Sequence, residues 1–175
     1  MSKSQKNQTV SIVLAALFTA IIAVFAQIPP STHEFPITLQ TFAIALCGYT
    51  LGIKYSLFSV TAYLLLGVAG APVFSGFCGG FHHISGPAGG FIIAFPIFSL
   101  FCAFSFKIQR NIYKIFSGIL GVCIMYVVGV LYFVLVTQTL LSAAILMYIW
   151  LFVKDVLFTL LAFYVSKIIR KRVIK

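Results

Sequence analysis

Apolar residues fill six long runs of this chain, and short polar or Gly/Pro-containing segments separate the runs. Each run approaches the roughly 17–25 residues that a helix needs to cross a bilayer. We therefore expect an all-α integral membrane protein with six transmembrane helices in a single domain over residues 1–175. The expected helices cover about 10–28, 37–53, 55–70, 90–106, 115–136 and 143–166.

The composition supports the same class. Of the 175 residues, 62% are hydrophobic and only 8% are charged, whereas soluble domains carry roughly 25% charged residues. A soluble core cannot absorb this much apolar surface in so short a chain, because small domains leave a large share of their surface in water. The solvent around most of this chain is therefore expected to be lipid.

The basic residues fall on one side of the six-helix arrangement. Eleven of the twelve lie in the terminal segments or in the second-to-third and fourth-to-fifth connections, while the three opposite connections hold none and one of them contains Glu34. This positive-inside pattern predicts cytoplasmic termini. The net charge of +10 then serves orientation and attraction to anionic lipid headgroups, not nucleic acid. The eleven are Lys3, Lys6, Lys54, Lys107, Arg110, Lys114, Lys167, Arg170, Lys171, Arg172 and Lys175.

The first apolar run has a second interpretation. Its basic start, its apolar stretch and the small residues Ala23 and Ala26 are also typical of a cleaved signal peptide. Removal of this run would leave an odd number of spans, five, so we expect a retained helix.

The twelfth basic residue, Lys154, lies inside the sixth run next to Asp155, one of only two acidic residues in the chain. Ionisable groups at membrane depth cost roughly 2.5–3.5 kcal/mol each and commonly mark a ligand or ion path. A pair that merely fixes helix depth near the interface is the alternative. Because adjacent helical residues point about 100° apart, we expect no mutual support between the two side chains of the i,i+4 kind. The pattern favours a ligand site.

The segment from Gly67 to Gly90 contains eight glycines and no Lys, Arg, Asp or Glu. Irregular backbone is tolerated at membrane depth only where it is buried in protein or lines a cavity, and glycines allow close approach to a ligand. The composition fits a flexible extracellular connector equally well. Both interpretations stay open at this point.

Catalytic and metal-binding motifs are not recognisable in the sequence. It contains no G-x-x-x-x-G-K-[ST] motif for ATP, and no Ser or Cys has the sequence context of a nucleophile. His82-His83 could suggest a metal, but three histidines and two acidic residues in the whole chain make a poor ligand set. We expect no enzyme activity, no cofactor and no metal. The four scattered cysteines, expected to be free and buried, are Cys47, Cys78, Cys102 and Cys123.

Small residues recur four positions apart in the first run, at Ala16 and Ala20. This spacing lets another helix approach closely. Taken alone, the pattern is explained as well by the frequency of alanine in membrane helices.

Four ordered motifs resemble those of the BioY family, the biotin-binding substrate-capture (S) components of energy-coupling-factor (ECF) transporters. The match is densest from about residue 29 to 106. The motifs are Pro36-Ile37-Thr38-Leu39-Gln40-Thr41, Gly52 shortly before a Lys, the stretch from Tyr63 to Gly76, and Gly86-Pro87-Ala88-Gly89-Gly90-Phe91.

The resemblance implies a small six-helix bundle in the cytoplasmic membrane that binds biotin near its outer face. It also implies docking on a transmembrane coupling subunit driven by two ATPase subunits, with Ala16 and Ala20 on the docking face. Asp155 would accept the ureido N–H groups of biotin, and Lys154 would meet the ureido oxygen or the carboxylate. The implied biotin-binding residues are Asp155, Lys154, Gln40, Phe74, Ser75, Gly76, Gly79, Gly80, Gly86 and Gly89.

One departure from the family concerns the last helix. The family pattern there is Gly-Asp-x-x-Lys, with the Lys one turn after the Asp, whereas this chain has Phe158 at that turn and a basic residue at Lys154 instead. Two other functions stay open beside biotin capture. One is capture of another vitamin or small anion, and the other is a membrane-embedded enzyme that uses His82, His83, Glu34 and Asp155.

Overall fold

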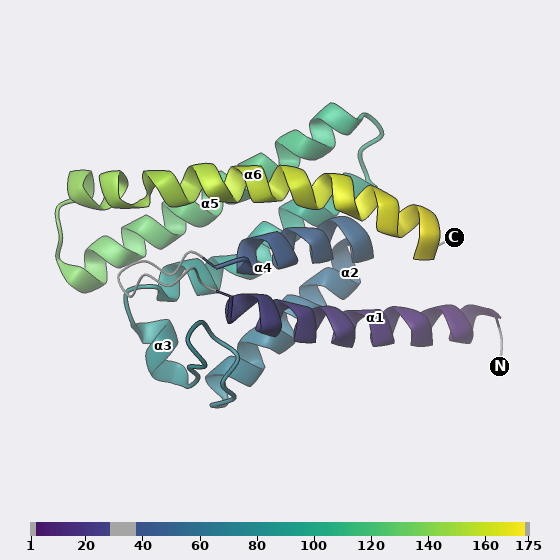
Figure 1. The fold of residues 1–175 in the computed structure, drawn as a ribbon, viewed down its shortest axis with the longest axis horizontal. Coiled ribbons are helices and arrows are strands. Elements are labelled where there is room, and N and C mark those ends of the chain that lie inside the picture. Colours follow the sequence, from purple (N-terminus) through teal and green to yellow (C-terminus); the bar gives the residue numbers. More distant parts are fainter. Residues whose placement is uncertain (1–2, 29–37, 174–175) are drawn as a thin grey trace.

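The computed structural model describes residues 3–28 and 38–173, and the side chains of 8–28 and 38–172. Within these ranges the chain is all-helical, and a single β-bridge joins Phe74 and Cys78. The expected all-α class is therefore confirmed. Glu34 and the Pro36-Ile37 start of the first motif lie outside the described residues, so expectations that rest on them stay predictions. The helices are α1 (Lys3–Ala26), α2 (Gln40–Val68), α3 (Phe81–Ser85), α4 (Gly89–Ala103), the 3-10 helix η1 (Phe104–Phe106), α5 (Asn111–Thr137) and α6 (Leu141–Val173) (Figure 1).

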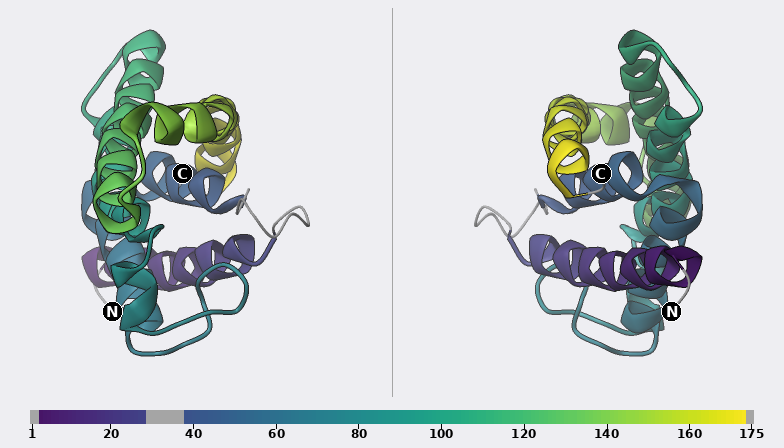
Figure 2. Two further views of the ribbon diagram at one scale, coloured as in Figure 1. Left: turned by 90° about the vertical axis from the view of Figure 1, so that its left-hand side faces the viewer. Right: turned by 90° about the vertical axis from the view of Figure 1, so that its right-hand side faces the viewer.

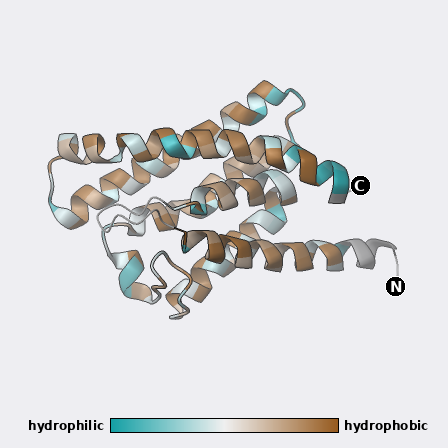
Figure 3. Cartoon of the chain, in the orientation of Figure 1, coloured by the Kyte–Doolittle hydropathy of each residue, from teal (hydrophilic) through white to brown (hydrophobic). Residues whose placement is uncertain are grey.

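Five helical segments in the described chain are long and apolar enough to cross a membrane: α1, α2, α4 with η1, α5 and α6. Their outward faces carry large apolar side chains such as Val24, Leu135, Leu146 and Trp150. Figure 3 shows the resulting hydrophobic covering along the helices. Surfaces of this kind are stable in lipid and not in water, so the chain is a multi-pass membrane protein.

The second and third predicted helices are the two arms of α2. Its 29 residues are interrupted at Gly52, whose φ of 75° and ψ of 179° are not helical. Glycine reaches this positive φ without a steric penalty. The chain turns at this break, so that the two arms form a V (Figure 1). The arm from Gln40 to Leu51 is about 18 Å long at 1.5 Å per residue, well short of a bilayer core.

Close packing places α2 at the centre of the bundle, in contact with α1, α4 and α6. Gly48 allows the approach of α4, because a Cβ at this position would lie 2.7 Å from both Cys102 Cβ and Ser99 O. Other extensive contacts join α4 to α5 and α5 to α6. The first arm of α2 is buried on nearly every residue, and this protein environment compensates for its short length.

The last two helices extend beyond their predicted apolar cores. α5 begins at Asn111 instead of 115, and α6 continues to Val173 instead of 166. Hydropathy detects only the apolar part of such a helix, whereas its polar turns continue in the interface. In the last turn of α6, the Arg170 guanidinium lies 3.9 Å from the centre of the Phe106 ring, a favourable cation–π contact.

The first helix begins and the last helix ends at the same end of the bundle (Figure 1). The connection between α5 and α6 lies at the opposite end, as the second view also shows (Figure 2). With the two arms of α2 counted separately, the five membrane-spanning segments of the described chain make six crossings, and an even number places both ends on one side. The cytoplasmic location of this end remains a prediction from the charge pattern.

Candidate ligand-binding site

A buried carboxylate, that of Asp155, lies midway along α6. Asp155 is only 3% exposed. Thr41 Oγ1 of α2 donates a hydrogen bond of 2.6 Å to its Oδ1, and the Tyr126 hydroxyl of α5 donates one of 2.7 Å to its Oδ2. Hydrogen bonds to a carboxylate are roughly twice as strong as neutral ones. They offset part of the cost of a charge at membrane depth.

Lys154 completes this cluster, and the expectation that it gives Asp155 no support is wrong. Its Nζ lies 2.8 Å from Asp155 Oδ1 in an ion pair and donates to the carbonyl of Thr38 at 3.1 Å. The two Cβ atoms diverge, but the long flexible stem of lysine brings the ammonium back to the carboxylate. The ammonium also lies 5.4 Å from the centre of the Phe158 ring. Its charge therefore lies over the side chain at the position where the resemblance described above predicts a lysine.

A cavity of about 100 Å³ opens beside this cluster. Polar groups from α2, the loop after it, and α6 form one part of its wall, and aromatic and aliphatic side chains of α4, α5 and α6 form the rest. A small set of polar groups within an apolar wall is typical of small-molecule sites. The lining residues are Thr38, Gln40, Thr41, Ser75, Phe91, Phe95, Met125, Tyr126, Tyr148, Leu151, Lys154 and Asp155.

Gln40 connects the cavity to the loop that follows α2. Its Nε2 donates to the Tyr63 hydroxyl at 2.9 Å, and this hydroxyl donates to the Val73 carbonyl at 3.1 Å. The Phe74 ring packs edge-on against Tyr63, with centroids 5.6 Å apart. Phe74 is 1% exposed and is not among the cavity-lining residues, so its visible contribution is to anchor the loop while its neighbour Ser75 lines the cavity.

Gln27, at the end of α1, holds the same loop from the other side. Its Nε2 donates to the Phe74 carbonyl at 2.9 Å, and its Oε1 accepts the Phe77 backbone N–H at 2.7 Å. Phe77 has a φ of 56°, which is uncommon for a bulky residue. The amide of Gln27 therefore clamps a turn that the loop sequence does not favour by itself.

Of the predicted site residues, the structure brings Asp155, Lys154, Gln40 and Ser75 to the cavity. Two of the predicted glycines serve close packing: a Cβ on Gly79 would collide with the backbone of Ala71, and one on Gly89 with the backbone of Ile84. The predicted glycines lie in the adjoining loop and at the start of α4, outside the cavity lining formed by the described residues. They are Gly76, Gly79, Gly80, Gly86 and Gly89.

Several wall residues were not predicted from the sequence. Thr38 and Thr41 belong to the Pro-Ile-Thr-Leu-Gln-Thr motif, which was a usable signal. Tyr126 and Tyr148 lie in apolar runs where tyrosine is unremarkable, and only the structure shows that Tyr126 contacts Asp155.

The two adjacent histidines belong to the short helix α3 and not to this cluster. His83 stacks on Phe74 with ring centroids 5.5 Å apart, and its partial burial, then the neighbouring His82, lower the pKa of its imidazole. The described residues include no group of three His, Cys, Asp or Glu side chains that could hold a metal. On α1, Ala16 and Ala20 are both exposed.

These features define a class: a small multi-pass helical membrane protein with a polar cavity among its helices. The chain belongs to the BioY family, whose sequence pattern matches residues 1–175. "Probable biotin transporter BioY" of Pyrococcus horikoshii is 42% identical over 116 residues, covering 66% of this chain and 69% of that protein. "Biotin transporter BioY" of Thermotoga maritima is 37% identical over 120 residues, covering 68% and 71%.

A solved structure agrees with this membership. The crystal structure of an S-component for biotin from an ECF-type ABC transporter superposes with a TM-score of 0.86 at 25% identity, covering 98% of this chain and 95% of that one. The relatives are described as transporters, so the enzyme interpretation with His82, His83, Glu34 and Asp155 is set aside.

Proposed function

We propose that this chain captures biotin in the cavity around Asp155 and acts as the S component of an ECF-type importer. Its relatives are described as biotin transporters, and its structural neighbour as the S-component for biotin. The observation that carries the proposal is the Asp155–Lys154 pair, held by α2 and α5 beside a cavity. A carboxylate and an ammonium suit a ligand that has both N–H donors and carbonyl or carboxylate acceptors.

The carboxylate has limited capacity for a ligand. A carboxylate offers about four acceptor positions, and Thr41, Tyr126 and Lys154 already use three on Asp155. One ureido N–H of biotin can therefore bind without displacing a protein donor. A second N–H must find another acceptor or replace one of the hydroxyl donors. Gln40, which is 6% exposed, offers a side-chain carbonyl in the same wall.

The apolar part of biotin has matching surface in the cavity wall. Phe91 and Phe95 of α4 and Leu151 of α6 line the same cavity as the polar groups. Burial of the thiophane ring and the aliphatic chain against these residues would contribute roughly 25 cal/mol per Å² of apolar surface removed from water.

The cavity must widen to admit biotin. Its volume of about 100 Å³ is below the roughly 300–1,000 Å³ of typical ligand sites. The Ser75 loop is held by the buried Phe74 ring and by hydrogen bonds from Gln27 and Tyr63, and it is the part of the wall that moves at least cost. The remaining walls are packed helices. The predicted role of Gly76, Gly79, Gly80, Gly86 and Gly89 is then to shape this loop around the ligand.

Transport requires partners. Drawing one negative charge inward against the membrane potential costs about 2.3 kcal/mol per 100 mV, and the sequence contains no P-loop for ATP. We propose that a transmembrane coupling subunit with two ATPase subunits supplies the energy and docks on the Ala16/Ala20 face of α1. The basic residues at the end where α6 terminates would face the cytoplasm and anionic lipid.

The identity of the substrate is tested by identifying the small molecule that stays bound to the protein during purification. The protein is purified from cells grown with biotin, washed and denatured, and the released small molecules are identified by mass spectrometry. The expected result is biotin in near-equal amount to the protein, and much less from Asp155→Asn protein. A different vitamin or organic anion in its place would assign the cavity to that compound.

A further inference from the structure

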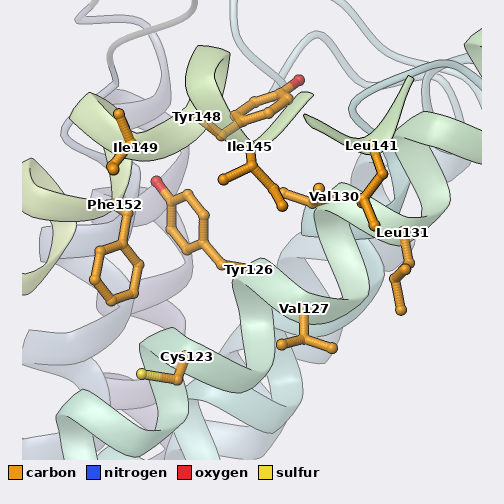
Figure 4. Close-up of a pocket in the computed structure, with 10 residues that line it drawn as sticks. All are labelled: Cys123, Tyr126, Val127, Val130, Leu131, Leu141, Ile145, Tyr148, Ile149 and Phe152. Atoms are coloured by element: carbon orange, nitrogen blue, oxygen red, sulfur yellow. The ribbon is translucent and has the colours of Figure 1, made fainter. Parts of the chain in front are cut away.

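A second hollow lies on the outside of the α5–α6 pair. It is an apolar groove of about 430 Å³, and Figure 4 shows Ile145 of α6 and Val130 of α5 pointing toward each other across it. The described lining consists of valine, leucine, isoleucine, phenylalanine and tyrosine side chains and one cysteine, Cys123, with no charged residue. The groove is thus of a kind that water does not fill readily.

The groove opens toward lipid. Both of its walls lie within membrane-spanning helices, and its rim residues Val127, Leu131 and Ile149 are 59%, 51% and 50% exposed. On α5 it runs from Cys123 to Leu131, which is about 12 Å at 1.5 Å per residue. One leaflet of the hydrocarbon core is about 15 Å thick. Its length and chemistry therefore match an extended hydrocarbon chain.

We propose that this groove binds one acyl chain of a membrane phospholipid, from the leaflet next to the connection between α5 and α6. In a bilayer, a lipid-facing groove without charged groups is filled by whatever apolar matter adjoins it, and acyl chains surround the membrane-spanning helices. Leu141, the first residue of α6, lines the groove. The groove therefore begins near the membrane surface, where a lipid headgroup can remain while its chain descends.

The acyl chain also forms part of the ligand site's support. Tyr126 and Tyr148 line both the groove and the polar cavity, so these two side chains form a common wall. The Tyr126 hydroxyl donates to Asp155 on the cavity side at 2.7 Å, while its ring faces the groove (Figure 4). A chain packed on the outer side of this wall limits the movement of the two rings. This inference depends on membrane location and not on the identity of the substrate.

Photo-crosslinking tests the site. The full chain is placed, one copy per disc, in nanodiscs of phosphatidylcholine and phosphatidylglycerol that contain a phosphatidylcholine with a diazirine midway along one acyl chain. After illumination, labelled residues are mapped by mass spectrometry. The expected result is several-fold more label on Tyr148 than on Tyr164, although Tyr164 of the same helix is 57% exposed and Tyr148 is only partly so.

Two neighbouring substitutions give a matched control. Ile145→Trp fills the groove and should reduce the Tyr148 label several-fold, whereas Leu146→Trp should leave it unchanged because Leu146 is 71% exposed and lies outside the groove lining. Equal labelling of Tyr148 and Tyr164 in the wild-type protein would overturn the proposal. This comparison uses no variant, so misfolding cannot account for its result. Loss of label from Cys123, which lines the groove and not the polar cavity, on addition of biotin would also overturn it, because the groove would then belong to the substrate.

Discussion

Lys154 and Asp155 are consecutive residues of α6, yet the ammonium of one lies 2.8 Å from a carboxylate oxygen of the other. Consecutive helical residues diverge at Cβ, so this pair depends on the length and flexibility of the lysine stem. The same ammonium lies over the Phe158 ring, 5.4 Å from its centre. The chain thus delivers a positive charge to the Asp155 site from the residue before the carboxylate instead of from the following turn.

A lysine at the position of Phe158 should restore the biotin affinity that is lost when Lys154 is replaced. Lys154→Met is expected to weaken biotin binding about ten- to a hundred-fold, because a hydrogen bond with a charged partner contributes roughly 1.5–3 kcal/mol. Adding Phe158→Lys places an ammonium three residues after Asp155, on the same helix face, and should recover much of the affinity. Phe158→Leu alone is the control for loss of the ring. Full affinity in Lys154→Met would make this lysine purely structural.

The Gln27 clamp should control how fast the ligand leaves. Gln27→Leu removes two hydrogen bonds to the Phe74–Phe77 turn, each contributing about 0.5–1.5 kcal/mol. Biotin release measured by stopped-flow exchange should accelerate roughly five- to a hundred-fold. Gln27→Glu keeps the acceptor for the Phe77 N–H and should have the smaller effect. Identical release rates in both variants would mean that another part of the wall opens.

The Phe74–His83 stack should loosen in acid. Burial and the nearby His82 lower the pKa of His83, so the folded loop holds fewer protons on this residue than the unfolded loop. The stability that this residue contributes is complete above about pH 6.5, the ordinary histidine value, and declines as the pH falls below it toward the lowered pKa.

Hydrogen exchange measures this effect. Protection of the Phe74 and Cys78 amides, which bond each other's carbonyls, should decrease in that pH range after correction for intrinsic rates. His83→Gln should abolish the pH dependence. His82→Gln should keep most of it, because burial is the larger cause of the shift. A dependence that survives His83→Gln would assign the transition to another group.

The Ala16/Ala20 face should affect coupling and not capture. Both residues are exposed on α1, so Ala16→Trp or Ala20→Trp adds bulk outside the bundle and should leave biotin binding by the isolated chain unchanged. Close helix contacts depend on small residues, so co-purification with the coupling subunit and biotin uptake should both fall. Leu17→Trp, at a 53% exposed position on the same helix, is the matched control. Normal uptake by both alanine variants would place docking elsewhere.

The spans were predictable because lipid imposes a strong constraint on composition and length. The break at Gly52 was only partly visible, since a glycine before a lysine indicates a turn but not its angle. Asp155 was conspicuous as one of two acidic residues. The residues that donate hydrogen bonds to its carboxylate were not recognisable in the sequence. Tyr126 comes from a helix whose sequence contains only apolar, aromatic and small residues around it. Which face of that helix meets Asp155 is decided by tertiary packing.

The glycine-rich loop shows the opposite difficulty. Its composition fitted close approach of the backbone to a ligand and a flexible connector equally well, whereas in the structure Gly79 and Gly89 approach other parts of the backbone. The requirement for a missing Cβ is the same in both cases, and sequence does not tell which neighbour imposes it. The Lys154–Asp155 contact was missed for a related reason, because helical spacing predicts where Cβ atoms point and not where a long side chain ends.

Calorimetric titration of the purified chain with biotin tests the central claim most directly. We expect saturable, tight, one-to-one binding by the wild-type protein and about ten- to a hundred-fold weaker binding by Asp155→Asn, which keeps the shape but removes the negative charge from a charge-assisted hydrogen bond. Circular dichroism and gel filtration should show both proteins folded. Absence of binding heat and of competition by biotin in folded wild-type protein would contradict biotin capture, and equal affinity in Asp155→Asn would contradict the role of the carboxylate.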